Sequence, residues 1–151
     1  MAIELDILSP TDRPALLGVS APDMQDYARG VLDQLGYKVH VAANAEEFLD
    51  RFGRVQYQLV LLDDNFGGET PALNTVQWMA MPLRRHATIC VLGDSYQTLD
   101  PLQAFQQSVH AVINRVDADK LMLILQQVIG DNASFLSTYR DVQAQMAQGK
   151  R

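Results

Sequence analysis

Two adjacent aspartates, Asp63 and Asp64, are the residues of this sequence best placed to do chemistry. They follow the apolar run Leu59–Leu62 and precede the turn-forming segment Asn65–Gly68. A short apolar run predicts a strand buried on both faces, and such a strand delivers the side chains at its end to the edge of a sheet. Carboxylates at that edge can bind a divalent cation, act in catalysis or pair with a cationic side chain.

Other polar side chains are predicted to reach the same edge, because parallel α/β sheets bind ligands outside the carboxyl ends of their strands. The predicted strand ends are Ser20-Ala21, Asp63-Asp64, Gly93-Asp94-Ser95 and Asn114-Arg115. Asp63, Asp64 and Asp94, with Asp23 at the first predicted helix, are weak candidates for a cation site. Acids at helix starts also serve capping and the helix dipole, so their number alone indicates no metal.

Several catalytic motifs are absent from the sequence. The run LVLLDDN is similar to the acidic strand of P-loop ATPases, but no G-x-x-x-x-G-K-[ST] stretch exists to cradle a phosphate. His40, His86 and His110 are scattered without the spacing of metal ligands. Cys90 lies inside an apolar run and is predicted to be a buried, unreactive thiol. No cofactor is predicted.

Strand-like and helix-like segments alternate five times along the chain. The predicted strands are residues 14–20, 37–42, 57–63, 88–92 and 111–114. Apolar residues at helical spacing follow each strand, in the ranges Met24–Leu35, Phe48–Phe52, Leu73–Leu83, Leu99–Val109 and Leu121–Val128. Five such repeats with short connections predict an open parallel sheet with helices on both faces.

The two ends fall outside these repeats. Residues 1–13 are predicted to form an arm or an extra strand, residues 14–130 the domain, and residues 131–151 a C-terminal helical extension. The extension has an amphipathic stripe of Phe135, Leu136, Tyr139, Val142 and Met146. A helix of this length is marginal alone, so the stripe is expected to cover the domain or to contact a partner, including a second copy. Gly130 either separates this helix from the preceding one or lies within a continuous helix.

The bulk composition is that of one globular domain: 151 residues, of which 48% are hydrophobic and 20% charged. A net charge of −6 argues against nucleic acid or anionic lipid as the main partner. The sequence has neither an apolar run long enough for a membrane span nor a recognisable signal peptide. A cytoplasmic location is therefore expected.

The order of elements, the LVLLD strand and the Leu-Gly-Tyr-Lys-Val junction at Leu35–Val39 together resemble a two-component receiver domain, over residues 14–129. The resemblance implies the CheY-like, flavodoxin-like fold with strand order 2-1-3-4-5. In that family the aspartate ending strand three accepts a phosphoryl group, and the matching residue here is Asp63. The family also has an acidic pair after strand one that holds Mg²⁺, a Thr or Ser ending strand four and a Lys ending strand five.

This sequence departs from that pattern at nearly every other position. Ser20 and Ala21 replace the acidic pair, and Gly93 replaces the hydroxyl residue, although Ser95 lies two residues on. Arg115 stands at the lysine position. The proline that usually follows the lysine is Val116, and the aromatic of strand five is Val112. We expect Arg115 to form an ion pair with Asp63 or Asp64, because its planar fork is not a neutral exchange for lysine.

These departures predict a non-catalytic pseudo-receiver, which is a protein–protein interaction module of bacterial signalling that works without phosphorylation. Its expected partner is another signalling protein, an output domain or a second copy of this chain. The alternative is a phosphorylatable receiver that takes phosphate from a histidine kinase onto Asp63 with a non-standard Mg²⁺ site. A third hypothesis is small-ligand sensing at the vacated edge, for which the sequence names no ligand.

Overall fold

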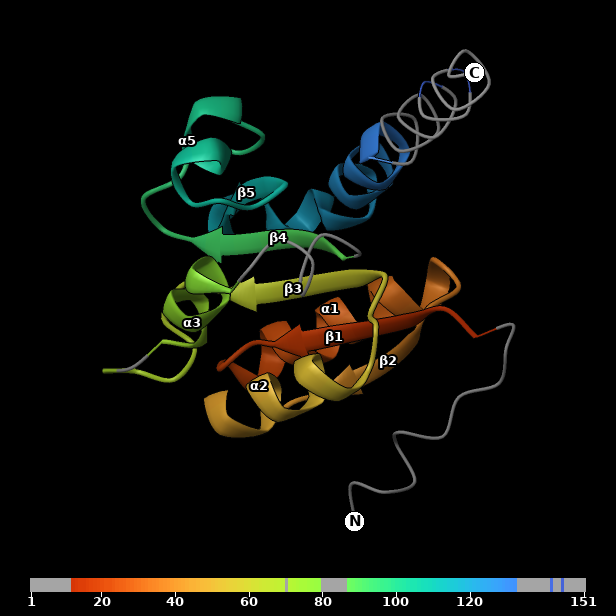
Figure 1. Cartoon of the computed structure of the whole chain (residues 1–151). Coiled ribbons are helices and arrows are strands. Elements are labelled where there is room, and N and C mark those ends of the chain that lie inside the picture. The colour runs from red at the N-terminus through yellow and green to blue at the C-terminus, as the bar shows by residue number, and fades with distance from the viewer. Residues whose placement is uncertain (1–11, 70, 80–86, 133–141, 143–144, 146–151) are drawn as a thin grey trace.

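The computed structural model of the protein describes residues 12–69, 71–79, 87–132, 142 and 145. Five parallel strands form one sheet in the order β2-β1-β3-β4-β5, as predicted (Figure 1). The strands are β1 (Pro14–Gly18), β2 (Lys38–Val41), β3 (Leu59–Asp63), β4 (Thr88–Gly93) and β5 (Ala111–Asn114). The register pairs Asp63 of β3 with Leu92 of β4 and Gly93 of β4 with Asn114 of β5, so these strand ends meet at one edge.

The helices are α1 (Pro22–Gln34), α2 (Ala45–Arg54), α3 (Ala72–Trp78), α5 (Pro101–Gln106), the 3₁₀ helix η2 (Arg115–Lys120) and a helix over residues 121–132. Their starts follow the expected chemistry. Pro22 is the first residue of α1, where the N–H that proline lacks would have no helical partner. Asn44 caps α2, because its Oδ1 accepts a hydrogen bond from Glu47 N at 2.8 Å. Gly36 follows α1 with a φ of 92°, a conformation that favours glycine.

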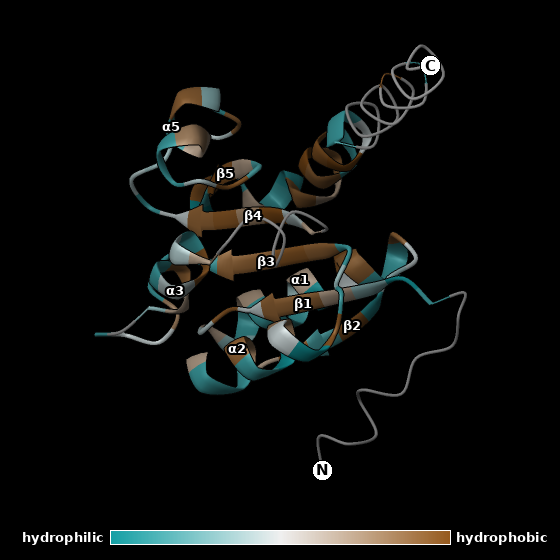
Figure 2. Cartoon of the chain, viewed as in Figure 1, coloured by the Kyte–Doolittle hydropathy of each residue, from teal (hydrophilic) through white to brown (hydrophobic). Residues whose placement is uncertain are grey.

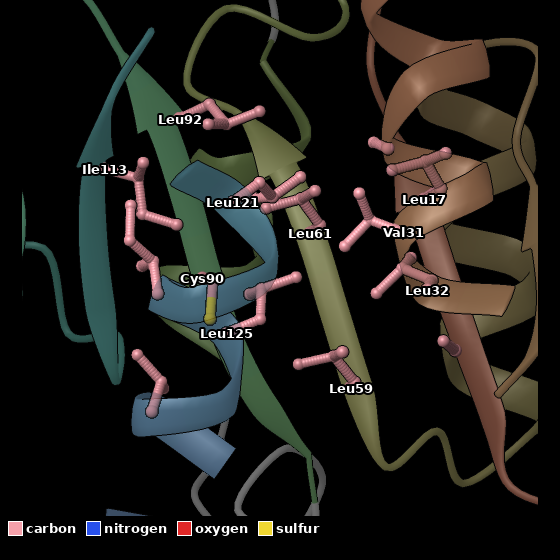
Figure 3. Close-up of a cluster of buried hydrophobic side chains, with 14 of the residues drawn as sticks. Leu17, Val31, Leu32, Leu59, Leu61, Cys90, Leu92, Ile113, Leu121 and Leu125 are labelled. Atoms are coloured by element: carbon pink, nitrogen blue, oxygen red, sulfur yellow. The ribbon is translucent and has the colours of Figure 1, made fainter. Parts of the chain in front are cut away.

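The sheet carries a separate apolar core on each face. On one face, α1 and the helix of residues 121–132 cover side chains such as Leu17, Leu61 and Leu92 (Figure 3). On the other face, α2, α3 and α5 cover Val60, Leu62 and their neighbours. The three central strands, β1, β3 and β4, are buried along their whole length, which explains their unbroken apolar sequences (Figure 2).

The fourth predicted helix differs from the structure. The spacing predicted one amphipathic stripe from Leu99 to Val109, but α5 begins only at Pro101 and ends at Gln106. Leu99 precedes the helix with a φ of 63°, and Leu102 and Phe105 are 64% and 80% exposed. The helix packs on the sheet through the small side chain of Ala104 instead. Apolar spacing located the helix here but assigned the wrong residues to its buried face.

Some predictions concern residues that the structure does not describe. These are residues 1–11, the end of the third predicted helix with Leu83 and His86, and Phe135, Leu136, Tyr139 and Met146 of the terminal stripe. The helix that begins at residue 121 continues through Gly130 to residue 132, so Gly130 does not end it. Within the part of the chain that the structure describes, the helices are too short or too polar to cross a lipid bilayer.

Candidate functional site

Asp63, the last residue of β3, is a buried carboxylate whose two oxygens both have donors. Its side chain is 5% exposed. Oδ2 accepts a hydrogen bond from Ser20 N at 2.9 Å, and Oδ1 accepts from Arg115 Nη2 at 3.0 Å and Nε at 3.3 Å. A main-chain N–H after β1 therefore approaches Asp63 where the family pattern has an acidic pair. The charge-assisted hydrogen bonds from Arg115 and the bond from Ser20 N compensate the cost of removing this carboxylate from water.

Arg115, the first residue of η2, joins three acidic side chains. Its Nη1 lies 2.9 Å from Asp94 Oδ1, and its Nη2 donates to Asp64 Oδ1 at 3.3 Å as well as to Asp63. The same nitrogen lies 3.4 Å from Asn65 Oδ1. We call Arg115, Asp63, Asp64, Asn65 and Asp94 the Arg115 cluster. The predicted ion pair is present and extends to Asp94.

The acidic side chains of the Arg115 cluster raise the pKa of the arginine. Partial burial alone would lower the pKa of Arg115, but hydrogen bonds with Asp94 and Asp63 outweigh this and raise the pKa above its usual range. The side chain of Arg115 is 27% exposed, whereas that of Asp94 is 81% exposed. The cluster thus runs from a buried carboxylate at Asp63 to a solvated one at Asp94, with the arginine between them.

Gly93, at the end of β4, has no room for a side chain. A Cβ placed there would lie 2.6 Å from Asp64 Oδ2 and 2.6 Å from Cε2 of Tyr96. Tyr96 is 9% exposed, and its ring fills the space beside Gly93. Burial raises the pKa of Tyr96, Asp64 raises it further, and Arg115 lowers it. The hydroxyl residue of the family pattern therefore cannot be accommodated at position 93 unless Tyr96 and Asp64 move.

A second polar network joins the loop after β4 to the end of β5 and to η2, next to the Arg115 cluster. Asn114 Nδ2 donates to Tyr96 O at 2.7 Å and to Asp94 O at 3.3 Å, and Asn114 N donates to Thr98 Oγ1 at 2.9 Å. Thr98 Oγ1 in turn donates to Asp117 Oδ2 at 2.5 Å. Tyr96 and Thr98 were not among the predicted site residues, because neither lies at a strand end. Only their position in the loop after β4 could have indicated them.

The remaining predicted site residues lie at the same edge without joining the cluster. Ala21 is exposed and precedes α1, and Asp23 is exposed in the first turn of that helix. Ser95 is exposed in the loop after β4. Among the described residues, no three or more His, Cys, Asp or Glu side chains are grouped so that they could hold a metal ion. Cys90 is buried in β4, where burial raises its pKa to about 12, as expected of an unreactive thiol.

Comparison with known sequences returned no match: no model of a protein family and no curated protein matches this chain. Comparison with solved structures, in contrast, found receiver domains. A CheY-like response regulator receiver domain protein from Methanospirillum hungatei JF-1 has a TM-score of 0.66 and 17% identity, over 82% of this chain and 98% of that one.

Two further neighbours show the contexts in which this fold occurs. The receiver domain of a sensor histidine kinase from Pseudomonas aeruginosa PAO1, with a magnesium ion coordinated in its active-site cleft, has a TM-score of 0.61 and 21% identity, over 80% of this chain and 99% of that one. NtrX from Brucella abortus, in complex with ADP, has a TM-score of 0.67 and 17% identity; the match covers 88% of this chain and 30% of NtrX.

This chain has the receiver fold. The TM-scores of 0.61–0.67 establish the arrangement of strands and helices, but at 17–21% sequence identity the likeness carries no information about phosphorylation. The function must therefore be argued from the residues at the edge of the sheet.

Proposed function

We propose that this protein is a pseudo-receiver of bacterial signal transduction: a non-enzymatic module that recognises a partner protein without being phosphorylated. The observation that carries the proposal is the position of Arg115. Its guanidinium already neutralises Asp63, the residue that matches the phosphoacceptor of receiver domains, at 3.0 Å. A phosphoryl group on Asp63 would have to displace these contacts.

The residues at this edge do not fit the Mg²⁺ ion that phosphoryl transfer to a receiver aspartate uses. Mg²⁺ prefers several hard oxygen ligands in octahedral geometry. Here the end of β1 offers the main-chain N–H of Ser20 to Asp63, and a donor cannot ligate a cation. The nearest oxygens of Asp63, Asp64 and Asp94 each face Arg115. A divalent cation beside a guanidinium would also meet direct electrostatic repulsion.

The switching residues of a receiver are missing as well. Gly93 has no hydroxyl that could bond a phosphoryl oxygen, and the ring of Tyr96 occupies the adjacent space. Val112, at the position of the family's aromatic, is buried in the core on the α5 side. A receiver needs a cation to neutralise the phosphoryl group and a hydroxyl side chain that moves toward it, in order to convert phosphorylation into a conformational change. Since both are missing here, binding of a partner to the unmodified protein surface is the simpler mechanism.

The partner is proposed to be another signalling protein, an output domain or a second copy of this chain. The terminal stripe that includes Phe135 and Val142 remains a predicted contact surface. Val142 is 47% exposed.

Intact-mass measurement after incubation with Mg²⁺ and acetyl phosphate tests the proposal. We expect no mass gain on the wild-type protein, because Asp63 is held by Arg115. The matched control is Asp63→Asn, which must likewise show no mass gain. A mass gain of one phosphoryl group that disappears in Asp63→Asn would favour the alternative, a receiver that takes phosphate on Asp63 with a non-standard Mg²⁺ site.

A further inference from the structure

Two aromatic side chains are exposed on helices α3 and α5. Trp78, the last residue of α3, is 89% exposed, and Phe105 on α5 is 80% exposed. Leu102, which lies on the same side of α5 as Phe105 at an i, i+3 spacing, is 64% exposed. Large apolar side chains that are exposed to this extent gain free energy when a partner covers them.

The two aromatic residues belong to one layer of the protein. Both helices pack on the same face of the sheet, α3 through Leu73 and Val76 and α5 through Ala104. Their C-terminal ends are joined, because Gln77 Nε2 donates to the main-chain oxygen of Gln107 at 3.1 Å and to its Oε1 at 3.0 Å. We call the exposed side of these two helices the Trp78 surface. Its residues are Asn74, Thr75, Trp78, Leu102, Phe105 and Gln106.

The Trp78 surface is built from segments without charge. Pro71–Met79 and Pro101–Ser108 contain no aspartate, glutamate, lysine or arginine, although 20% of the whole chain is charged. By contrast, α2 packs on the same face of the sheet but exposes Glu46, Asp50 and Arg54. The cores of protein interfaces are likewise depleted of charged residues and enriched in Trp and Phe. The Trp78 surface therefore has the composition of an interface core.

A surface without charge is suited to pairing with a copy of itself. In a two-fold symmetric dimer the same residues face one another, so a charged side chain near the axis would meet its own like charge. The polar groups here are instead the amides of Asn74 and Gln106 and the hydroxyl of Thr75. Each of them contains both a hydrogen-bond donor and an acceptor. Each can therefore pair with its own copy, which two carboxylates or two ammonium groups cannot do.

We infer that two copies of this chain pair through the Trp78 surface, with Trp78 and Phe105 of each copy covered by the other. The surface contains no residue of β5 or of the helix over residues 121–132, which covers the opposite face of the sheet. The pairing therefore leaves that side of the domain accessible to another protein. This inference rests on the proposed function, because it selects a second copy among the partners of a module that binds without phosphorylation.

The full-length protein and its single tryptophan provide the first test. Sedimentation equilibrium should show the mass rising with concentration from the 16.8 kDa of one chain to that of two. The emission maximum of Trp78 should shift to shorter wavelength over the same concentrations, because pairing removes the indole from water. Added salt should strengthen the pairing, since each copy has a net charge of −6 and salt screens the repulsion. A mass of one chain up to about 1 mM, an unchanged emission maximum as the mass doubles, or weakening by salt would overturn the inference.

Matched variants locate the contact. Phe105→Lys removes one aromatic side chain but keeps the tryptophan signal. Val116→Lys makes the same change of charge at an apolar side chain on η2 that is 81% exposed. The association should weaken at least about tenfold for Phe105→Lys and less than about twofold for Val116→Lys. Equal effects of the two substitutions would contradict pairing through the Trp78 surface.

Opposite charges at Gln106 test the two-fold pairing itself. Gln106→Lys and Gln106→Glu should each associate at least about threefold more weakly than the wild type, because like charges then face one another. An equimolar mixture of the two variants should recover the association. The same two substitutions at exposed Gln126, on the helix that covers the opposite face of the sheet, are the control, and mixing them should change nothing. A Gln106 mixture that associates no better than either variant would overturn the inference.

The association assay is independent of the phosphorylation assay. Sedimentation is repeated after incubation with Mg²⁺ and acetyl phosphate, and the intact mass is measured on the same sample. Pairing through the Trp78 surface in a protein that also gains a phosphoryl group would retain the inference and overturn the proposed function. A protein that gains no phosphoryl group and remains a single chain would overturn the inference alone.

Discussion

The Arg115 cluster and helix α5 differ in what they leave unsatisfied. In the Arg115 cluster, one guanidinium meets three carboxylates, and the most buried of them, Asp63, has a donor on each oxygen. On α5, the apolar side chains of Leu102 and Phe105 are 64% and 80% exposed. Polar groups that satisfy one another have little to offer a ligand, whereas exposed apolar surface gains free energy when it is covered. The first region is therefore expected to contribute to stability, and the second offers apolar surface to the partner that we propose.

Removal of Arg115 is the largest expected perturbation of this comparison. Arg115→Ala leaves Asp63, which is 5% exposed, beside Asp64 without a cation, so the free energy of unfolding should fall by about 2–3 kcal/mol. Urea unfolding measures it. The control is Arg54→Ala, whose partner Asp50 lies 2.9 Å away but in an exposed pair, 53% and 62% accessible. That loss should stay below about 0.5 kcal/mol. Equal losses would mean that the Arg115 cluster is an ordinary surface pair.

A methyl group at position 93 should be the next largest perturbation. Gly93→Ala places Cβ 2.6 Å from Asp64 Oδ2 and from the Tyr96 ring, and overpacking of this kind costs about 1–3 kcal/mol. Gly53→Ala is the matched control, because Gly53 lies within α2 with nothing within 4 Å of the added Cβ. There alanine should stabilise by about 0.5–1 kcal/mol. Thermal unfolding of both variants distinguishes them. A neutral Gly93→Ala would show that Tyr96 moves aside easily.

The smallest expected effect is at the solvated end of the Arg115 cluster. Asp94→Asn removes the charge that faces Arg115 Nη1 at 2.9 Å, but Asp94 is 81% exposed. The loss of unfolding free energy should be about 0.5 kcal/mol and should diminish as salt is added. A loss as large as that of Arg115→Ala would show that Asp94, rather than Asp63, is the main partner of the arginine.

Much of this architecture could be predicted from the sequence, because burial on both faces leaves a clear record. The runs at Leu59–Leu62 and Thr88–Leu92 predicted β3 and β4, and the alternation of strands and helices predicted the parallel sheet. The ion pair of Arg115 with Asp63 or Asp64 was also predicted. Asp63 ends β3 and Arg115 directly follows β5, and the carboxyl ends of parallel strands meet at one edge.

What could not be predicted depends on how loops close in three dimensions. The ring of Tyr96 beside Gly93 and the left-handed φ of Leu99 arise from the path of the segment between β4 and α5, and no local spacing encodes that path. The exposure of Leu102 and Phe105 was missed for a related reason. Periodicity identifies an apolar stripe, but it does not show that a helix as short as α5 can pack through Ala104 instead.

The central claim is that Arg115 occupies the place at Asp63 that a divalent cation would need, and a Mg²⁺ titration followed by backbone amide NMR tests it most directly. We predict that the amide signals of Ser20, Asp63 and Asp64 show no saturable change up to about 10 mM Mg²⁺, because no octahedral set of oxygen ligands is free beside Asp63. Saturable shifts confined to these amides in the wild-type protein would contradict the claim.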